Sequence, residues 1–260
     1  MLSTVYKDIQ IAPNVTLTII DIDELDSQIE VILDANFVEI CEGLSGSDIS
    51  TVKTRVEALY STKNDEWIMG ATAEFFIHLY IRLNGYKQEC LFLNLEENSI
   101  KKGFDGLYSK EGQEWLMESK AGSILSEDVS HVSKVKLAMH DLANKVAGKD
   151  DKGKRGRSNN PWQEAYSHAS HCDVGTALDI RRNLKKLADE FTNGQYKDIS
   201  EFNTMPCGTV FLAGSWNPQD HTQIKNQIQR LVPNLKGAQI HVVCATHKSA
   251  QLFMEYIKRR

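Results

Sequence analysis

Residues 102–120, KGFDGLYSKEGQEWLMESK, are the stretch that decides the fold. Two apolar runs, residues 104–108 and 115–117, lie on either side of a short polar segment. That segment contains Glu111 followed by Gly112, a pair that suits a two-residue turn between paired strands. The stretch therefore predicts a β-hairpin.

Three charged residues of this hairpin are predicted to converge. Counting outward from the turn puts Asp105 directly opposite Glu118, with Cβ atoms about 5 Å apart. Lys120 lies two residues after Glu118, so it points to the same face of the strand, roughly 6.6 Å along the chain. Two acids and a lysine are therefore expected at one place.

Such a cluster has a chemical use. Two facing carboxylates repel each other unless a cation lies between them, and Mg²⁺ takes oxygen ligands while keeping positions open for water and phosphate. A lysine beside a metal-bound water can orient the nucleophile or neutralise charge that develops on a phosphorane. The alternative is an exposed hairpin in which Glu118 and Lys120 form a surface ion pair, the common fate of a Glu-x-Lys triplet.

The order Gly-Phe-Asp-Gly, turn, apolar strand, Glu-Ser-Lys over residues 103–120 resembles the PD-(D/E)xK nuclease motif. More closely, residues 70–146 resemble the HamA family, the nuclease subunits of Hachiman anti-phage systems. The chain departs from the motif at Phe104, which stands where the motif name has proline.

The resemblance implies a restriction-endonuclease-like mixed sheet flanked by helices. It implies that Asp105 and Glu118 bind Mg²⁺ or Mn²⁺ and that Lys120 is catalytic, with the Ser119 carbonyl as a further possible ligand. It also implies a DNA-cleaving effector of a bacterial defence complex, held with a helicase partner (HamB-like).

Glu74 is a carboxylate next to the most apolar part of the chain. It follows Gly70, whose bare backbone would permit close approach of another element, and precedes residues 75–83, which are apolar nearly all round a helix. A buried carboxylate needs a partner. In nucleases of the resembled type a helix glutamate at this place often joins the metal site, so we assign Glu74 a catalytic role. The alternative is a helix glutamate that bonds Arg82 or nearby backbone.

Composition describes an ordinary globular protein of 260 residues, with 41% hydrophobic and 25% charged side chains. No run of eighteen apolar residues is present, and the N-terminus lacks a basic and an apolar signal region, so we expect a cytoplasmic protein. The five cysteines form no Cys-x-x-Cys pair, which argues against a disulfide framework and a zinc ribbon.

Charge is distributed unevenly along the chain. Residues 1–50 contain one base and ten acids, a net charge of 1 − 10 = −9, and the remaining 210 residues carry 29 bases and 25 acids, a net of +4. The second value is compatible with a phosphate-binding face. The acidic region, about residues 1–60, is expected either to neutralise the basic remainder or to dock on a basic partner.

Hydrophobic periodicity predicts the other elements. These are a strand at residues 15–22, a helix from Asp48 or Ser50 to Tyr60, a helix from Asn64 or Asp65 to Leu83, a strand at residues 89–95, and an amphipathic helix along Leu125, Val129, Val132, Val135, Met139, Leu142 and Val146. The apolar run 29–40 fits a strand or a helix. The order around the acid cluster predicts an α/β fold, with residues 1–260 as one domain whose core spans about 64–147.

The last third of the chain is predicted to widen the same sheet. Residues 209–213 and 239–245 have strand character and flank a helical stretch at 219–231, and residues 252–260 read as a short helix.

Several basic residues are candidates for contact with DNA phosphates. They are Lys101 and Lys102 beside the hairpin, Lys154, Arg155 and Arg157 in the glycine-punctuated loop 148–160, and Arg181, Arg182, Lys185 and Lys186 on a helix. The loop has GxxxxGK spacing, but a helix precedes it and arginine follows it, so it is not a P-loop. The alternatives are a solvated linker for the loop and a solvated face for the helix.

His168, His171 and Cys172 have the spacing of metal ligands on a helix, but without a fourth ligand nearby the sequence disfavours zinc there. The leading interpretation is therefore an Mg²⁺-dependent DNA endonuclease. Two alternatives stay open: a free-standing restriction or repair nuclease, and a non-catalytic nuclease-like scaffold that binds DNA or a partner.

Overall fold

The computed structural model describes residues 3–94, 99–100, 103–149 and 159–259. The strands are β1 (Ser3–Ala12), β2 (Val15–Ile22), β3 (Lys87–Gln88), β4 (Leu93–Asn94), β5 (Ser99–Ile100), β6 (Gly106–Lys110), β7 (Gln113–Ser123), β8 (Asn203–Phe211) and β9 (Ile240–His247). The α-helices are α1 (Ser27–Glu42), α2 (Ile49–Tyr60), α3 (Asp65–Leu83), α4 (His131–Val146), α5 (Pro161–Ala169), α6 (Leu178–Thr192), α7 (His221–Leu231) and α8 (Gln251–Lys258). Short 3₁₀ helices are η1 (Cys172–Val174), η2 (Ile199–Glu201) and η3 (Val232–Asn234).

Seven strands form one mixed sheet in the order β1-β2-β9-β8-β7-β6-β3. The strands β2, β9, β8 and β7 run parallel to one another, and antiparallel pairs extend the sheet at both edges. The prediction of an α/β fold with a mixed sheet flanked by helices is confirmed. The late strands do widen the same sheet, as expected, and β7 lies in its interior.

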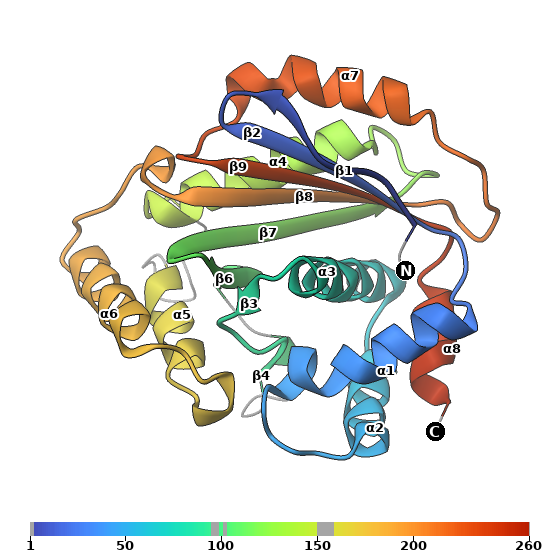
Figure 1. Cartoon of the computed structure of the whole chain (residues 1–260), viewed down its shortest axis with the longest axis horizontal. Helices are drawn as coiled ribbons and strands as arrows, with labels where there is room; N and C mark the ends of the chain where they lie inside the picture. The colour runs from blue at the N-terminus through green and yellow to red at the C-terminus, as the bar shows by residue number, and fades with distance from the viewer. Residues whose placement is uncertain (1–2, 95–98, 101–102, 150–158, 260) are drawn as a thin grey trace.

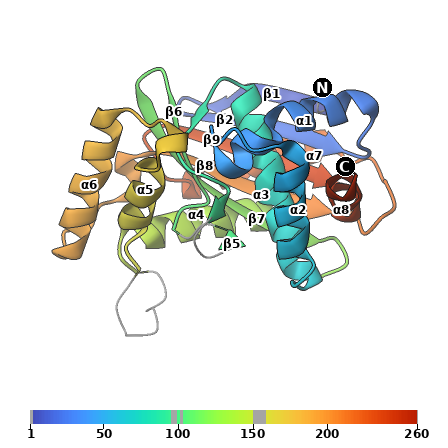
Figure 2. The same cartoon turned by 90° about the horizontal axis from the view of Figure 1, so that it is seen from below.

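Helices cover both faces of this sheet (Figure 1). One apolar core joins α1, α2, α3 and α8 to one face, and a second joins α4, α5, α6 and α7 to the other. Neighbouring residues of β7 divide between them, because Leu116 belongs to the second core and Met117 to the first. Figure 2 shows α5 and α6 at the opposite end of the molecule from α2 and α8.

The hairpin forms in the predicted register. Lys110 pairs with Gln113, and the ladder runs to Gly106 opposite Met117. Glu111 and Gly112 both have positive φ, 51° and 75°, as a primed two-residue turn requires. The turn therefore fixes which side of β7 each later residue faces.

The predicted starts of α2 and α3 are also confirmed. Asp48 caps α2 by accepting from the Ser50 N–H, and Asn64 caps α3 by accepting from the Trp67 N–H. The ambiguous run 29–40 is helical within α1, where the Asp26 side chain caps the first turn. A cap satisfies backbone donors that a helix leaves unpaired at its start.

Three expectations about local structure are wrong. Residues 89–95 do not form one strand, because the chain leaves the main sheet after Gln88 and pairs again only as β4 with β5. The amphipathic helix starts at His131, where Ser130 caps it, so Leu125 lies outside it and is 80% exposed. At Gly70 no atom of the described residues lies within 4 Å of where a Cβ would be, so none of the described elements approaches closely there.

Three buried histidines predict sensitivity to acid. Burial lowers the pKa of His131 and of His241 to about 4 and that of His247 to about 3. Each is therefore neutral in the fold at pH 7, and its contribution to stability is complete above the ordinary value near 6.5 and lost as pH falls toward the folded-state pKa. Between these pH values, each histidine lowers the free energy of unfolding by about 1.4 kcal/mol for every unit by which the pH falls.

The urea midpoint should therefore fall steeply between pH 6.5 and pH 4. The matched variant is His247→Leu, because His247 lies against Phe76 and Phe211 and its Nε2 has no hydrogen-bond partner among the described residues. That variant should show a shallower decline. Equal midpoints at pH 7 and pH 5 in the unaltered chain would disprove this account.

Candidate functional site

Glu118 is the centre of a charged cluster on β7. The residue is 1% exposed, and both of its carboxylate oxygens accept hydrogen bonds from lysines. Lys120 Nζ lies 2.8 Å from Oε1, and Lys145 Nζ, from α4, lies 2.6 Å from Oε2. The prediction that Glu118 and Lys120 share a face of one strand is confirmed.

The helix α4 supplies two residues of this cluster that the sequence reasoning missed. Asp141 accepts from Lys120 Nζ at 2.8 Å, and Lys145 also donates to the Gly103 carbonyl at 2.8 Å. A signal was present in the sequence: Lys145 falls three residues after Leu142, on the side of the amphipathic helix that packs against the sheet. A lysine on such a stripe needs a buried partner.

Asp105 is held next to β7 by its neighbours. The Ser119 backbone N–H donates to Asp105 Oδ2 at 2.9 Å. Phe104 packs its ring on Trp162 of α5, with centroids 4.9 Å apart, and Gly103 approaches Glu164 of the same helix so closely that a Cβ would lie 2.9 Å from it. Phe104, in place of the motif proline, therefore anchors the segment that carries Asp105. The strand pairing itself ends one step short of an Asp105 and Glu118 pair.

The electrostatics of the cluster show competition between burial and charge. Burial, and then the charge of Asp105, raise the pKa of Glu118, while Lys145 and Lys120 oppose them. Burial acts to lower the pKa of Lys120 and of Lys145, but the negative charges of Glu118 and Asp105 outweigh it and raise both. Asp105 and Glu118 are therefore close enough to repel, and the positive charges of Lys120 and Lys145 oppose the effect of this repulsion on Glu118.

The cluster fits a hard divalent cation by its donors. Asp105 and Glu118 offer carboxylate oxygens, the ligand type that Mg²⁺ and Mn²⁺ take, and their mutual repulsion favours a cation. Both Glu118 oxygens already accept from ammonium groups, so a metal would either share these oxygens with the lysines or displace one of the lysine contacts. Of the two lysines, Lys145 is the one that lies outside the hairpin, on α4.

Glu74 lies on a helix that packs on the other face of the sheet. The α3 core includes Met117, whereas Glu118 points toward α4. Glu74 Oε1 is 3.4 Å from His78 Nε2, and His78 Nδ1 contacts the Tyr108 hydroxyl. The structure thus gives Glu74 a histidine neighbour on the α3 side and does not bring it into the described contacts of the Glu118 cluster. Its catalytic role stays a prediction.

Five of the predicted DNA-contacting residues, Lys101, Lys102, Lys154, Arg155 and Arg157, lie outside the described residues. The other four lie on α6, where Arg182, Lys185 and Lys186 are exposed and Arg181 is half-buried.

Two of the α6 cations are partly neutralised. Lys185 pairs with Asp189 at 2.7 Å, and Lys186 lies 3.8 Å from Glu190. The helix meets β7 through Asn183, which donates to Glu114. That contact is about 13 Å along the strand from Glu118. The helix α6 therefore contacts the same strand that carries the Glu118 cluster.

Six of the ten acids in residues 1–50 contact a basic side chain. The pairs are Asp8 with His241, Asp21 with His221, Glu30 with Arg259, Asp34 with Lys53, Glu39 with Arg82, and Glu42 with Arg55. In both views α1 and α2 lie away from α6 (Figures 1 and 2). The exposed acids at residues 23–26 stand before α1.

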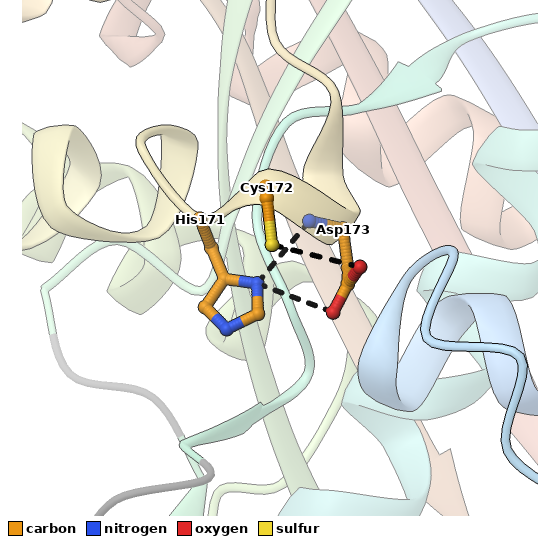
Figure 3. A group of neighbouring side chains, drawn as sticks. All are labelled: His171, Cys172 and Asp173. Atoms are coloured by element: carbon orange, nitrogen blue, oxygen red, sulfur yellow. Dashed lines mark hydrogen bonds and ion pairs between the residues drawn. The ribbon is translucent and has the colours of Figure 1, made fainter.

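A second group of possible metal ligands, His171, Cys172 and Asp173, lies at η1 (Figure 3). The ligand atoms lie within 4.8 Å of one another. His171 Nδ1 accepts from the Asp173 N–H, and Cys172 Sγ lies 3.7 Å from Asp173 Oδ1. These are the contacts of a capped turn, and they account for the closeness of the three side chains without a metal.

Comparison of the chain with protein-family models and with curated proteins finds no match. Within the described part of the chain, no helix combines the length and the apolar character that a membrane crossing needs.

Proposed function

We propose that the chain is a metal-dependent phosphodiesterase acting on DNA, and that its active site is the cluster of Asp105, Glu118, Lys120 and Lys145. The observation that supports this most is a fully buried glutamate, on an interior strand of an α/β sheet, beside a second carboxylate and two lysines. A buried group with a shifted pKa and specific charged partners is typical of active sites.

The residues divide the work as follows. Asp105 and Glu118 would hold Mg²⁺ or Mn²⁺, which when bound activates water and neutralises phosphate charge. Lys120, 26% exposed on its side chain, is the ammonium that can turn from Asp141 toward a phosphate. Lys145 is more buried and is fixed by the Gly103 carbonyl, so it keeps the Glu118 side chain in place.

The resemblance to the HamA family adds a biological role to the proposed activity. The chain would act as the nuclease of a bacterial anti-phage complex whose other member is a helicase (HamB-like). The family resemblance carries this part, together with the exposed acids of the N-terminal region, which offer a docking face to a basic protein.

One observation favours a second function, a non-catalytic scaffold. The ion pairs around Glu118 satisfy both of its oxygens without a metal, so the cluster is complete as a structural network. A buried ion-pair network of this kind can specify packing without any chemistry. The two functions differ in whether a divalent metal binds.

A plasmid-degradation assay tests the proposed function. The purified chain should degrade plasmid DNA in Mg²⁺ and not in excess chelator, either alone or when co-expressed with its neighbouring genes. Asp105→Asn serves as the inactive comparison, because it keeps side-chain volume and the contact to the Ser119 N–H. Degradation that is equal with Asp105→Asn would assign the activity to a contaminant and contradict the proposal.

The acidic region gives a separate prediction about the helicase partner. Reversing the exposed acids Asp23 and Glu24 to lysine should weaken co-purification with the partner and leave cleavage chemistry intact. The difference from the unaltered chain should be largest at low salt and shrink as salt rises, because salt screens these charges. Asp21 is left unchanged because it bonds His221 at 2.8 Å. Glu127→Lys, an exposed acid elsewhere, is the control.

If the double reversal keeps the partner fully bound while nuclease activity alone rises, the acidic region acts within the chain instead. Binding that falls equally in the Glu127→Lys control would show a general charge effect and no specific docking face.

A further inference from the structure

The helix α4 lies along β7, and its contacts follow the strand in reverse sequence order. Lys145 Nζ lies 2.6 Å from Glu118 Oε2. Asp141, one turn earlier on the helix, lies 2.8 Å from the Nζ of Lys120, two residues later on the strand. Side chains two residues apart on a strand point to the same face. Because β7 pairs with β8 in unbroken register over residues 115–123, the next position on this face is two residues beyond Lys120.

That next position is Gly122, and the side chain of Lys134 lies against it. A Cβ added at Gly122 would lie 2.7 Å from Lys134 Cε and 2.9 Å from Lys134 Nζ, so the lysine occupies the space that a side chain there would fill. Lys134 lies two turns before Asp141 on α4, and therefore on the same side of the helix. It brings a third ammonium group to the face that holds Lys120 and Lys145.

The ammonium group of Lys134 differs from the other two in its partners. Lys120 and Lys145 each contact a carboxylate, whereas Lys134 is half-buried and forms no ion pair with any described residue. The acids nearest to it before the helix, Glu127 and Asp128, are exposed and do not pair with it. A partly desolvated cation without a counter-ion favours a negatively charged ligand.

Gly122 lies near the carboxyl end of a parallel strand. The strands β2, β9, β8 and β7 run in one direction, so their carboxyl ends form one edge of the sheet. Ligands of α/β sheets commonly bind outside that edge. Lys120 and Gly122 are roughly 6.6 Å apart along the strand, about two of the 3.4 Å steps that separate successive phosphates along a DNA strand's axis. This separation suits phosphates one or two nucleotides apart.

We propose that Lys134 binds a backbone phosphate of the DNA substrate, one or two nucleotides from the phosphate that Lys120 contacts. The inference rests on the proposed function, because the Asp105 and Glu118 site defines which phosphate is cleaved. It adds the path of the substrate to that site: the DNA backbone passes along α4 toward the carboxyl end of β7. A contact of this kind positions the DNA without reading its sequence.

DNA binding by the full chain in excess chelator tests the contact apart from cleavage. Fluorescence anisotropy with a labelled duplex over a range of salt gives the affinity and its salt dependence. Lys134→Met keeps the hydrocarbon stem beside Gly122 and removes the charge. It should weaken binding at least about threefold at low salt and reduce the slope of log affinity against log salt by about 0.9, the value of one phosphate contact on duplex DNA.

The matched control is Lys136→Met, which removes the same charge from the same helix. Lys136 is exposed, and two residues of helix turn it about 200° away from the Lys134 direction. This variant should keep the salt slope of the unaltered chain. Gly122→Ala keeps both lysines, but its Cβ displaces the Lys134 ammonium, so it should weaken binding and add little when combined with Lys134→Met.

Three results would overturn the contact: equal loss of affinity in Lys134→Met and Lys136→Met, an unchanged salt slope in Lys134→Met, or no DNA binding by the unaltered chain. The nuclease proposal is judged separately by Mg²⁺-dependent plasmid degradation. Cleavage together with an unchanged slope in Lys134→Met would refute this contact alone. The expected slope change in a chain that never cleaves DNA would keep the contact and refute the nuclease activity.

Discussion

Glu118→Gln should abolish Mg²⁺-dependent DNA cleavage, with a loss of at least about 10³-fold, the scale seen when one catalytic electrostatic group is removed. Glutamine keeps the volume and can still accept from one lysine. It removes the charge that balances Lys120 and Lys145, and it weakens metal binding because a neutral amide oxygen is a poorer ligand for Mg²⁺. Alanine is a less clean change, since it would leave the buried Lys145 unpaired.

The control is Glu114→Gln, the same substitution four residues earlier on β7, where the carboxylate accepts from Asn183. It should cleave normally. Initial rates on plasmid DNA, with circular dichroism to verify folding, give the comparison. Full activity in Glu118→Gln would exclude this cluster as the active site.

Lys120→Met and Lys145→Met should differ by about 10²-fold or more in cleavage, and this is the second large effect. Lys120 is the partly exposed ammonium that can reach a phosphate, so its loss should lower cleavage strongly while Mn²⁺ binding is kept. Lys145 occupies Glu118 Oε2, so its loss should strengthen Mn²⁺ binding and spare more of the activity.

Stability adds an independent readout. Removing one partner from a buried ion pair costs about 3–5 kcal/mol, so Lys145→Met should unfold at lower urea without metal. Mn²⁺ should restore more stability to Lys145→Met than to the unaltered chain, because the cation takes the position of the lost ammonium. Equal cleavage and equal Mn²⁺ affinity in the two lysine variants would contradict this division of roles.

Local signals in the sequence predicted the hairpin and the starts of α2 and α3. Glu111-Gly112 defines the turn, and counting outward from it placed Glu118 and Lys120 on one face. The caps Asp48 and Asn64 act within one turn of chain, which is why they could be read directly. Such features depend on neighbours in sequence and not on distant packing.

Features that depend on distant segments could not be predicted in the same way. Lys145 reaches Glu118 across 27 residues of chain, and only the packing of α4 on β7 brings them together. The run after Gln88 has strand composition, but its buried side chains serve the α3 core, so apolar character alone misassigned it. The edge strand β1 has irregular pairing and a positive φ at Asp8, which obscure its alternation.

Calorimetric titration of the unaltered chain with Mn²⁺ at pH 7 tests the central claim most directly. The account predicts saturable binding that is lost or greatly weakened in Asp105→Asn and in Glu118→Gln and kept in Lys120→Met. Absence of binding at millimolar Mn²⁺, or binding that survives in both carboxylate variants, would contradict a metal-dependent active site and leave the cluster as a buried ion-pair network.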